Sequence, residues 1–196
     1  VVGFLQDCKT LGIRVLPPDI NSSRHKFFAI DRNTIRYGLG AVKGVGEGAC
    51  IAIASERDDG GNFTDLMDFC RRVDSTKLNK RVLEALIHSG ALDGLGSNRA
   101  SLALQLPEVL KATEQMAREA QSGQVSLFGA SPATAIHIDL PNVPESPIED
   151  RLKAERETLG FFLSAHPMDP WSREFKQLGV CPLIDAPTFW QERKDR

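Results

Sequence analysis

Gly44-Val45-Gly46, a valine flanked by two glycines between short apolar runs, constrains the fold of this chain more than any other feature. Glycine tolerates positive φ and lets another backbone approach closely, so the triplet predicts a tight turn that plugs Val45 into a core. The apolar spacing predicts a short helix before the turn and a second helix after it, which buries Cys50 and Ile53. Unpaired amide groups at the start of that second helix form a ready site for an anion. The alternative is a plain glycine-rich turn that binds no ligand.

The remaining patterns predict a mainly helical chain with one small β-hairpin near its N-terminus. Alternating apolar residues in two short runs around Asp31-Arg32-Asn33 predict the hairpin. Eight of the eleven prolines follow residue 130, so the stretch 129–147 predicts a linker or an extended loop. Apolar residues at helical spacing predict further helices over 1–12, 64–70 with Thr64 as cap, 79–89, 107–121 and 148–164.

A second and less regular copy of the helix–turn–helix unit follows, with Ser89-Gly90-Ala91 as its turn. Ser97 or Asn98 is expected to cap the helix that starts at Arg99. Two such units in tandem favour binding to one duplex, because each can hold phosphates of a different strand. The candidate phosphate-binding residues are Lys43, Gly44, Val45, Gly46, Gly48, Lys77, Lys80, Arg81, Ser89, Gly90, Ala91, Asn98 and Arg99.

The net charge of this 196-residue chain is −2 and its isoelectric point is about 6.1, so no global positive field attracts nucleic acid. The charges are uneven along the sequence. Residues 32–57 carry a positive excess of two charges, whereas residues 139–157 carry a negative excess of three. A nucleic-acid surface is therefore expected in the first half of the chain, where it depends on local contacts.

Other functional classes receive little support from the sequence. The four cysteines and four histidines are scattered, and their spacing predicts neither a metal site nor a disulfide framework. The adjacent acid pairs Asp58-Asp59 and Glu149-Asp150 are weak candidates for a two-metal nuclease, because in a glycine loop and at a helix start acids more commonly are solvated or cap the helix. No apolar run has membrane-spanning length and no signal peptide is evident, so we expect a cytoplasmic protein without a membrane partner. The absence of an initial Met predicts a piece of a longer protein.

The pentapeptide Gln124-Val125-Ser126-Leu127-Phe128 lies between the last long helix and the proline-rich stretch. Two large apolar side chains in a predicted loop are poorly placed for the chain's own core. Leu127 and Phe128 can fill an apolar pocket of a partner, which contributes roughly 3–6 kcal/mol before ordering costs. The alternative is that both side chains fold back onto the helical domain.

Four blocks of sequence, residues 11–21, 37–46, 78–93 and 155–167, contain ordered motifs such as Pro-Pro-Asp-Ile-Asn and Glu-Thr-Leu-Gly. Together they resemble the C-terminal part of the alpha subunit of bacterial DNA polymerase III, a replicative DNA-directed DNA polymerase. The resemblance implies tandem helix-hairpin-helix units that bind duplex DNA without reading its sequence. It also implies that residues 124–128 bind the sliding clamp. The aspartates that hold magnesium lie upstream in that family, so no catalytic residue, metal or cofactor is expected in this chain.

The same resemblance implies a division of the chain into five parts. The expected function is non-catalytic and supports processive synthesis, with duplex DNA, the sliding clamp (beta subunit) and the rest of the polymerase III holoenzyme as partners. The alternative is a protein-interaction scaffold of the replisome in which the hairpins are only structural. The expected parts are the end of the fingers region (1–18), the tandem helix-hairpin-helix domain (19–121), the clamp-binding motif and linker (122–147), a helical connector (148–178) and the start of a truncated OB-fold domain (179–196).

Overall fold

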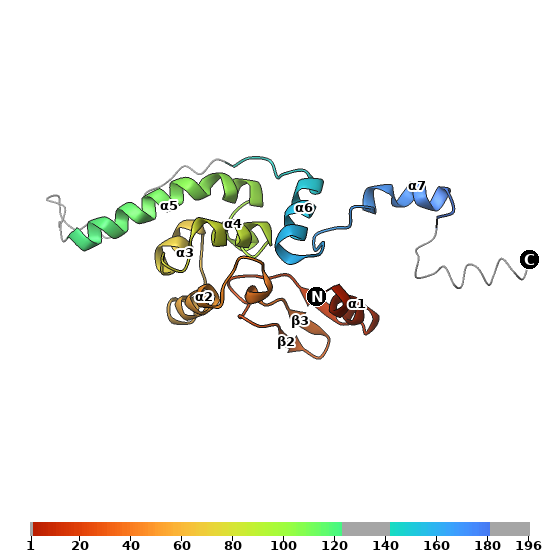
Figure 1. Cartoon of the computed structure of the whole chain (residues 1–196), viewed down its shortest axis with the longest axis horizontal. Helices are drawn as coiled ribbons and strands as arrows, with labels where there is room; N and C mark the ends of the chain where they lie inside the picture. The colour runs from red at the N-terminus through yellow and green to blue at the C-terminus, as the bar shows by residue number, and fades with distance from the viewer. Residues whose placement is uncertain (1, 123–141, 181–196) are drawn as a thin grey trace, which may run out of the picture.

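The computed structural model describes residues 2–122 and 142–180, which are mainly helical with a small sheet, as the sequence predicted (Figure 1). The pentapeptide 124–128 and nearly all of the predicted OB-fold start lie outside the described residues. Three single turns of 3-10 helix are η1 (Leu39–Ala41), η2 (Asp93–Leu95) and η3 (Asp169–Trp171). The α-helices are α1 (Val2–Thr10), α2 (Glu47–Gly60), α3 (Leu66–Arg72), α4 (Lys80–His88), α5 (Arg99–Ser122), α6 (Ile148–Leu159) and α7 (Ser172–Gln177).

The predicted β-hairpin is present and forms part of a three-stranded sheet. Its strands are β2 (Phe28–Asp31) and β3 (Thr34–Arg36), which pair antiparallel. The preceding strand β1 (Arg14–Leu16) pairs parallel with β3, which gives the order β1-β3-β2. The local pattern predicted the hairpin but not the parallel pairing, because that pairing joins segments separated by a long connection.

A single apolar core lies among α2, α3, α4 and α5. Helix α4 buries Val82, Leu83, Leu86 and Ile87, the stripe that its sequence predicted. Helix α3 packs on α5, and α4 packs on both α5 and α6. Figure 1 shows these helices gathered around α4, while the end of α5 extends beyond them and α7 lies apart on the opposite side.

The cap of α3 is Asp65 rather than the predicted Thr64. The Asp65 carboxylate accepts a hydrogen bond from the Asp68 amide at 2.8 Å. The Asp68 carboxylate in turn accepts one from the Thr64 amide at 3.3 Å. An ionised carboxylate binds a helix-end amide more strongly than a hydroxyl does, and this reciprocal arrangement satisfies two backbone donors.

Helix α5 runs through Pro107, although the sequence predicted a new helix from that residue. Proline has no N–H, so the carbonyl of Ala103 lacks its usual helical donor. Leu106 and Val109 are both buried in the core, one on each side of the proline. Their packing holds the two halves of α5 in one helix.

Helix α6 ends at Leu159, five residues before its predicted end, because Gly160 adopts a φ of 86° and forms the left-handed cap. The carbonyl of Thr158, in the last turn, accepts a hydrogen bond from the Lys43 amide at 2.8 Å. Leu159 is buried in the main core. The Glu-Thr-Leu-Gly block therefore fastens α6 to the first hairpin.

A buried carboxylate, that of Glu155, fastens the same helix to α5. Its Oε1 lies 2.9 Å from Nη1 of Arg99, and the Arg99 guanidinium also contacts Asp93. Its Oε2 accepts hydrogen bonds from the amides of Leu163 and Ser164, at 2.7 and 2.9 Å, and the Ser164 hydroxyl donates to Oε1. Burial opposes ionisation, but the hydrogen bonds from Ser164, Leu163 and Arg99 outweigh it and lower the pKa of Glu155 below its ordinary 4.5.

We expect Glu155→Gln to lower the free energy of unfolding by about 3 kcal/mol at neutral pH, because the change leaves Arg99 buried with a weaker partner. A pKa that is lower in the folded state contributes stability above the ordinary value, and that stability is lost as pH falls through the folded pKa. The difference between the two proteins should therefore shrink below about pH 4.5. Urea denaturation at neutral and acid pH measures both quantities.

The matched control is Glu114→Gln, which removes the same charge from an exposed pair with Arg118 on α5. Exposed pairs of this kind contribute about 0.5 kcal/mol or less. Equal losses in the two variants would contradict the anchoring role of Glu155.

Candidate nucleic-acid interface

The first glycine turn is exposed, and its central valine is buried, as the sequence predicted. Gly44 has a φ of 91°, which L side chains rarely adopt, whereas Gly46 has an extended backbone with a φ of −78°. The Val45 side chain is 6% exposed and belongs to the main core. A Cβ at Gly44 would lie 3.7 Å from that of Ala85. The turn therefore rests on α4 and shows its backbone to solvent.

The start of α2 carries amide groups with no partner. Gly46 is the N-cap and has no side chain to satisfy them. Across residues 2–122 and 142–180, no hydrogen bond is made by the amides of Gly46, Glu47 or Gly48. Such amides combine with the helix dipole to attract an anion.

Cationic side chains from three segments surround this helix start. Lys43 precedes the turn and is exposed. The chain of Lys77 passes close to Gly48, where an added Cβ would lie 3.8 Å from the Lys77 Cδ. Arg81 is four residues before Ala85 and so shares the face of α4 on which the turn rests. None of the three cations forms an ion pair within the described residues, whereas Lys80 lies 3.7 Å from Glu84.

One acidic group lies on the same helix turn. The Glu47 side chain is 70% exposed, and its carboxylate lies 3.8 Å from Nδ1 of His25. His25 also lies directly against Gly40. Sequence reasoning missed this histidine, because it stands in the loop before β2 and no periodic pattern connects it with α2.

The second turn is closed, contrary to the prediction that Ser89, Gly90 and Ala91 contact DNA. Ser89 and Ala91 are 0% and 2% exposed, and Gly90 is also buried. Their three amides donate to the carbonyls of α4 residues, so none is free for a phosphate. The Arg99 guanidinium lies over Gly90 and covers the turn. These three residues are therefore excluded from the candidate interface.

The predicted DNA contacts at the start of α5 are also engaged internally. The Asn98 side chain caps the helix as expected, accepting from the Ser101 amide at 2.8 Å, and it donates to the Val143 carbonyl at 2.7 Å. The Arg99 guanidinium is held by Asp93 and Glu155. Although burial opposes its charge, these carboxylates raise the pKa of Arg99 above its ordinary value.

The acid pairs lie at helix ends. Asp58 and Asp59 belong to the last turns of α2, not to the predicted loop, and Asp58 pairs with Arg57 at 3.2 Å. Glu149 and Asp150 stand in the first turn of α6, where negative charge suits the helix dipole. Among the described residues, no cluster of three or more potential metal ligands is found. No helix in that part of the chain is long and apolar enough to span a bilayer.

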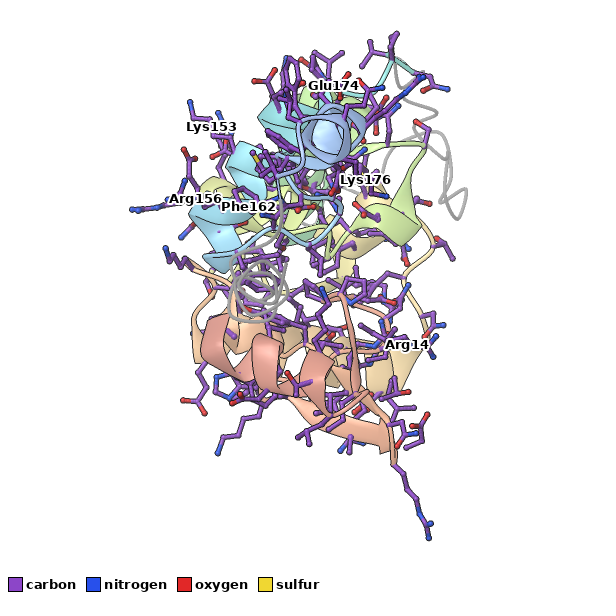
Figure 2. The ribbon with its side chains drawn as sticks, turned by 90° about the vertical axis from the view of Figure 1, so that its right-hand side faces the viewer. Arg14, Lys153, Arg156, Phe162, Glu174 and Lys176 are labelled. Atoms are coloured by element: carbon purple, nitrogen blue, oxygen red, sulfur yellow. The ribbon has the colours of Figure 1, made fainter. Side chains whose placement is uncertain are left out.

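A separate apolar cavity of about 350 Å³ lies between α6 and the segment 162–170, away from the candidate phosphate-binding residues. Figure 2 shows Lys153 and Arg156 projecting from α6 on the same side, with Phe162 beside Arg156. The Arg156 guanidinium lies 6.0 Å from the centre of the Phe162 ring. Both Lys153 and Glu149 line the cavity, so its rim is of mixed charge.

Comparisons with known proteins agree with the geometry of the first turn. A family model described as a helix-hairpin-helix motif matches residues 12–102. The DNA polymerase III subunit alpha of Xylella fastidiosa (strain Temecula1) is 56% identical over 185 residues, which cover 93% of this chain and 16% of that subunit. The corresponding subunit of Vibrio cholerae is 44% identical over 188 residues, covering 95% of this chain and 16% of the relative. The corresponding subunit of Escherichia coli K12 is 44% identical over 179 residues, which cover 90% of this chain and 15% of that subunit.

The resemblance to the alpha subunit of DNA polymerase III is thus confirmed over nearly the whole chain. The chain spans about 16% of the length of these relatives.

We expect Gly44→Ala to lower the free energy of unfolding by about 1–2 kcal/mol, because alanine is strained at a φ of 91°. Gly46→Ser should change it by less than about 0.5 kcal/mol, since serine suits an N-cap with extended backbone. Urea denaturation of the two variants measures the difference. Similar losses at both positions would show that the turn is not built as described.

Proposed function

We propose that this chain binds duplex DNA without catalysing a reaction. Over the segment that it spans, the chain belongs to the alpha subunits of bacterial DNA polymerase III. The observation that supports this function is the exposed start of α2, where the amides of Gly46, Glu47 and Gly48 have no partner among the described residues. Lys43 and Lys77 lie beside it. Backbone amides and lysines contact phosphates, not bases, so the binding is independent of sequence.

The proposed interface consists of the first hairpin and the cations around it. Each charge-assisted hydrogen bond to a phosphate contributes about 1.5–3 kcal/mol, so one helix start and a few lysines give weak binding. The chain's net charge of −2 adds no general attraction. We expect the segment to hold product duplex as one part of the larger holoenzyme in the cytoplasm. Its residues are Lys43, Gly44, Gly46, Gly48, Lys77, Lys80 and Arg81, with Val45 as the buried support.

A structural scaffold is the alternative function, and salt dependence distinguishes the two. Binding that neutralises phosphates releases counterions, so affinity falls steeply as salt rises. A scaffold whose hairpins only pack helices has no affinity for duplex DNA that falls with salt. The observation that favours DNA binding is the exposure of the first turn, which leaves the amides at the start of α2 accessible beside Lys43 and Lys77.

We expect Gly46→Val to weaken duplex binding about tenfold, because the side chain would stand before the free amides of α2. A Cβ at Gly46 meets nothing within 4 Å and the backbone there is extended, so the fold should tolerate valine. The loss should be equal for two duplexes of different base sequence. Fluorescence anisotropy at several salt concentrations measures affinity and its salt dependence.

Gly94→Val is the matched control, since a Cβ at Gly94 also meets nothing within 4 Å but lies outside the proposed interface. This variant should bind duplex like the original protein. A loss confined to one base sequence, or an equal loss in both variants, would contradict phosphate binding by the first hairpin.

We further propose that residues 124–128 bind the sliding clamp. These residues lie outside the described part of the chain, and the proposal is supported by their sequence, Gln-Val-Ser-Leu-Phe. The motif follows directly after α5, which ends at Ser122 and extends beyond the helical body in Figure 1. In the sequence the motif lies about 80 residues after the first glycine turn, so we infer that the two bind different partners.

Replacing Gln124, Leu127 and Phe128 together with Ala should abolish binding to the clamp and leave duplex affinity unchanged. The reason is that Leu127 and Phe128 provide roughly 3–6 kcal/mol of apolar burial, most of what so short a peptide can offer. Calorimetric titration of the sliding clamp into each protein measures the first effect. Unchanged clamp affinity would rule out this motif as the tether.

A further inference from the structure

The two hairpins differ at the start of their second helices. At α2 the N-cap is Gly46, and the next two amides, of Glu47 and Gly48, have no partner among the described residues. At α5 the N-cap is Asn98, and the next two amides both have the same partner. Equivalent positions are therefore open in one hairpin and filled in the other.

The group that fills the second position is the carboxylate of Glu145. Its Oε2 accepts from the Arg99 amide at 3.1 Å, and its Oε1 accepts from the Ala100 amide at 3.2 Å. Burial opposes ionisation, but hydrogen bonds from the amides of Ser146, Arg99 and Ala100 lower the pKa of Glu145, so it is an anion at neutral pH. Two oxygens of one anion on two successive amides is the contact that a phosphate makes at a helix start.

The carboxylate is held there by a short segment, residues 142–146, which we call the clip. The Oδ1 of Asn142 accepts a hydrogen bond from the Ser97 hydroxyl at 2.9 Å. The Val143 amide donates to the Ser101 hydroxyl at 3.0 Å, and the Val143 carbonyl accepts from Asn98. These bonds join the clip to the first turn of α5, to its cap Asn98 and to the preceding Ser97. Among the contacts of the clip, the two that the Glu145 carboxylate makes with the amides of Arg99 and Ala100 are those that a competing anion can replace.

Arginine side chains and carboxylates meet at the same place. A cavity of about 130 Å³ beside the clip is lined by His88, Arg99 and Arg151, together with the acids Glu145 and Asp150. The Nε of Arg151 is buried and has no hydrogen-bond partner in the described part of the chain. An orphaned donor of this kind is uncommon and is satisfied when an anion or a water enters. The Nε of Arg151 is thus the donor in this cavity that an entering phosphate oxygen can satisfy.

We propose that Glu145 is an internal competitor for duplex phosphate, and that the second hairpin holds phosphate only when the clip leaves the start of α5. The inference rests on the proposed function, because duplex DNA is taken as the ligand of the first hairpin. Displacement frees the amides of Arg99 and Ala100 in the same arrangement as those of Glu47 and Gly48. The two hairpins then present two phosphate sites, as tandem units require to hold both strands.

The experiment compares duplex binding by the original chain with that of Glu145→Gln, which weakens the internal anion. We expect affinity to rise about fivefold, the factor that one net hydrogen bond provides. The plot of log affinity against log salt should also steepen by about 0.9, the value for one more neutralised phosphate. Backbone NMR signals of Arg99 and Ala100 should shift on adding duplex to the variant but not to the original chain.

Two controls separate competition from other effects. Glu149→Gln removes the same charge four residues later, at an exposed position with no ion pair in the described residues, and should bind like the original chain. Ser101→Ala loosens the clip without changing any charge and should raise affinity in the same direction as Glu145→Gln. Circular dichroism checks that α5 stays folded in each variant, and Ser101→Ala decides the question should Glu145→Gln unfold.

The outcomes distinguish this inference from the function on which it rests. If Gly46→Val weakens binding but neither Glu145→Gln nor Ser101→Ala strengthens it, the first hairpin binds DNA and the competition is wrong. If Glu149→Gln raises affinity as much as Glu145→Gln, the effect is one of general charge and the competition is again wrong. If Gly46→Val has no effect, the proposed function fails and the inference fails with it.

Discussion

The contact between Glu155 and Arg99 fastens α6 to the start of α5. It buries a carboxylate completely, and it is tolerable only because Arg99, Ser164 and the amide of Leu163 supply donors on every side. Through this contact α6 is fixed to the start of α5, and through the Thr158 carbonyl the same helix is fixed to the first turn. Residues more than a hundred positions apart in the sequence therefore set the geometry of one glycine turn. A helix outside the hairpins thus contacts both of them.

The two hairpins differ in what pairs with the amides at the start of their second helices. A glycine cap leaves donors exposed, and exposed donors stay available to a ligand. At α5, Asn98 and Glu145 meet the same requirement from within the protein, which favours stability over binding. The burial of Gly90 under Arg99 follows the same principle, since a guanidinium drawn to Asp93 and Glu155 must lie across the turn. Internal pairing at α5 thus uses the kind of backbone donor that α2 leaves exposed.

Much of the fold could be predicted from the sequence, because its determinants are local. The stripe Val82, Leu83, Leu86 and Ile87 has a helical period, and Gly44 stands where a positive φ is needed. The open hairpin and its nearby lysines were predicted for the same reason. The closure of the second hairpin could not be predicted, since Glu145 is 46 residues from Arg99 in a proline-rich stretch without periodicity. Likewise the parallel pairing of β1 with β3 depends on tertiary contact. The predicted helix start at Pro107 was wrong, because α5 continues through this residue. Local propensity takes no account of the buried neighbours that stabilise the helix there.

Because α5 continues through Pro107, a change of helix direction at this residue moves the whole part of α5 that follows it. Beyond the proline about 15 residues remain, which at 1.5 Å each form an arm of roughly 22 Å. A bend of about 20°, the size that proline commonly introduces, moves the tip of such an arm by roughly 8 Å. The helix is held at the position of the proline, because the neighbouring Leu106 and Val109 are packed in the core. Side-chain packing deep inside the domain thus aims the far end of α5, and small changes of volume there would be magnified at its tip.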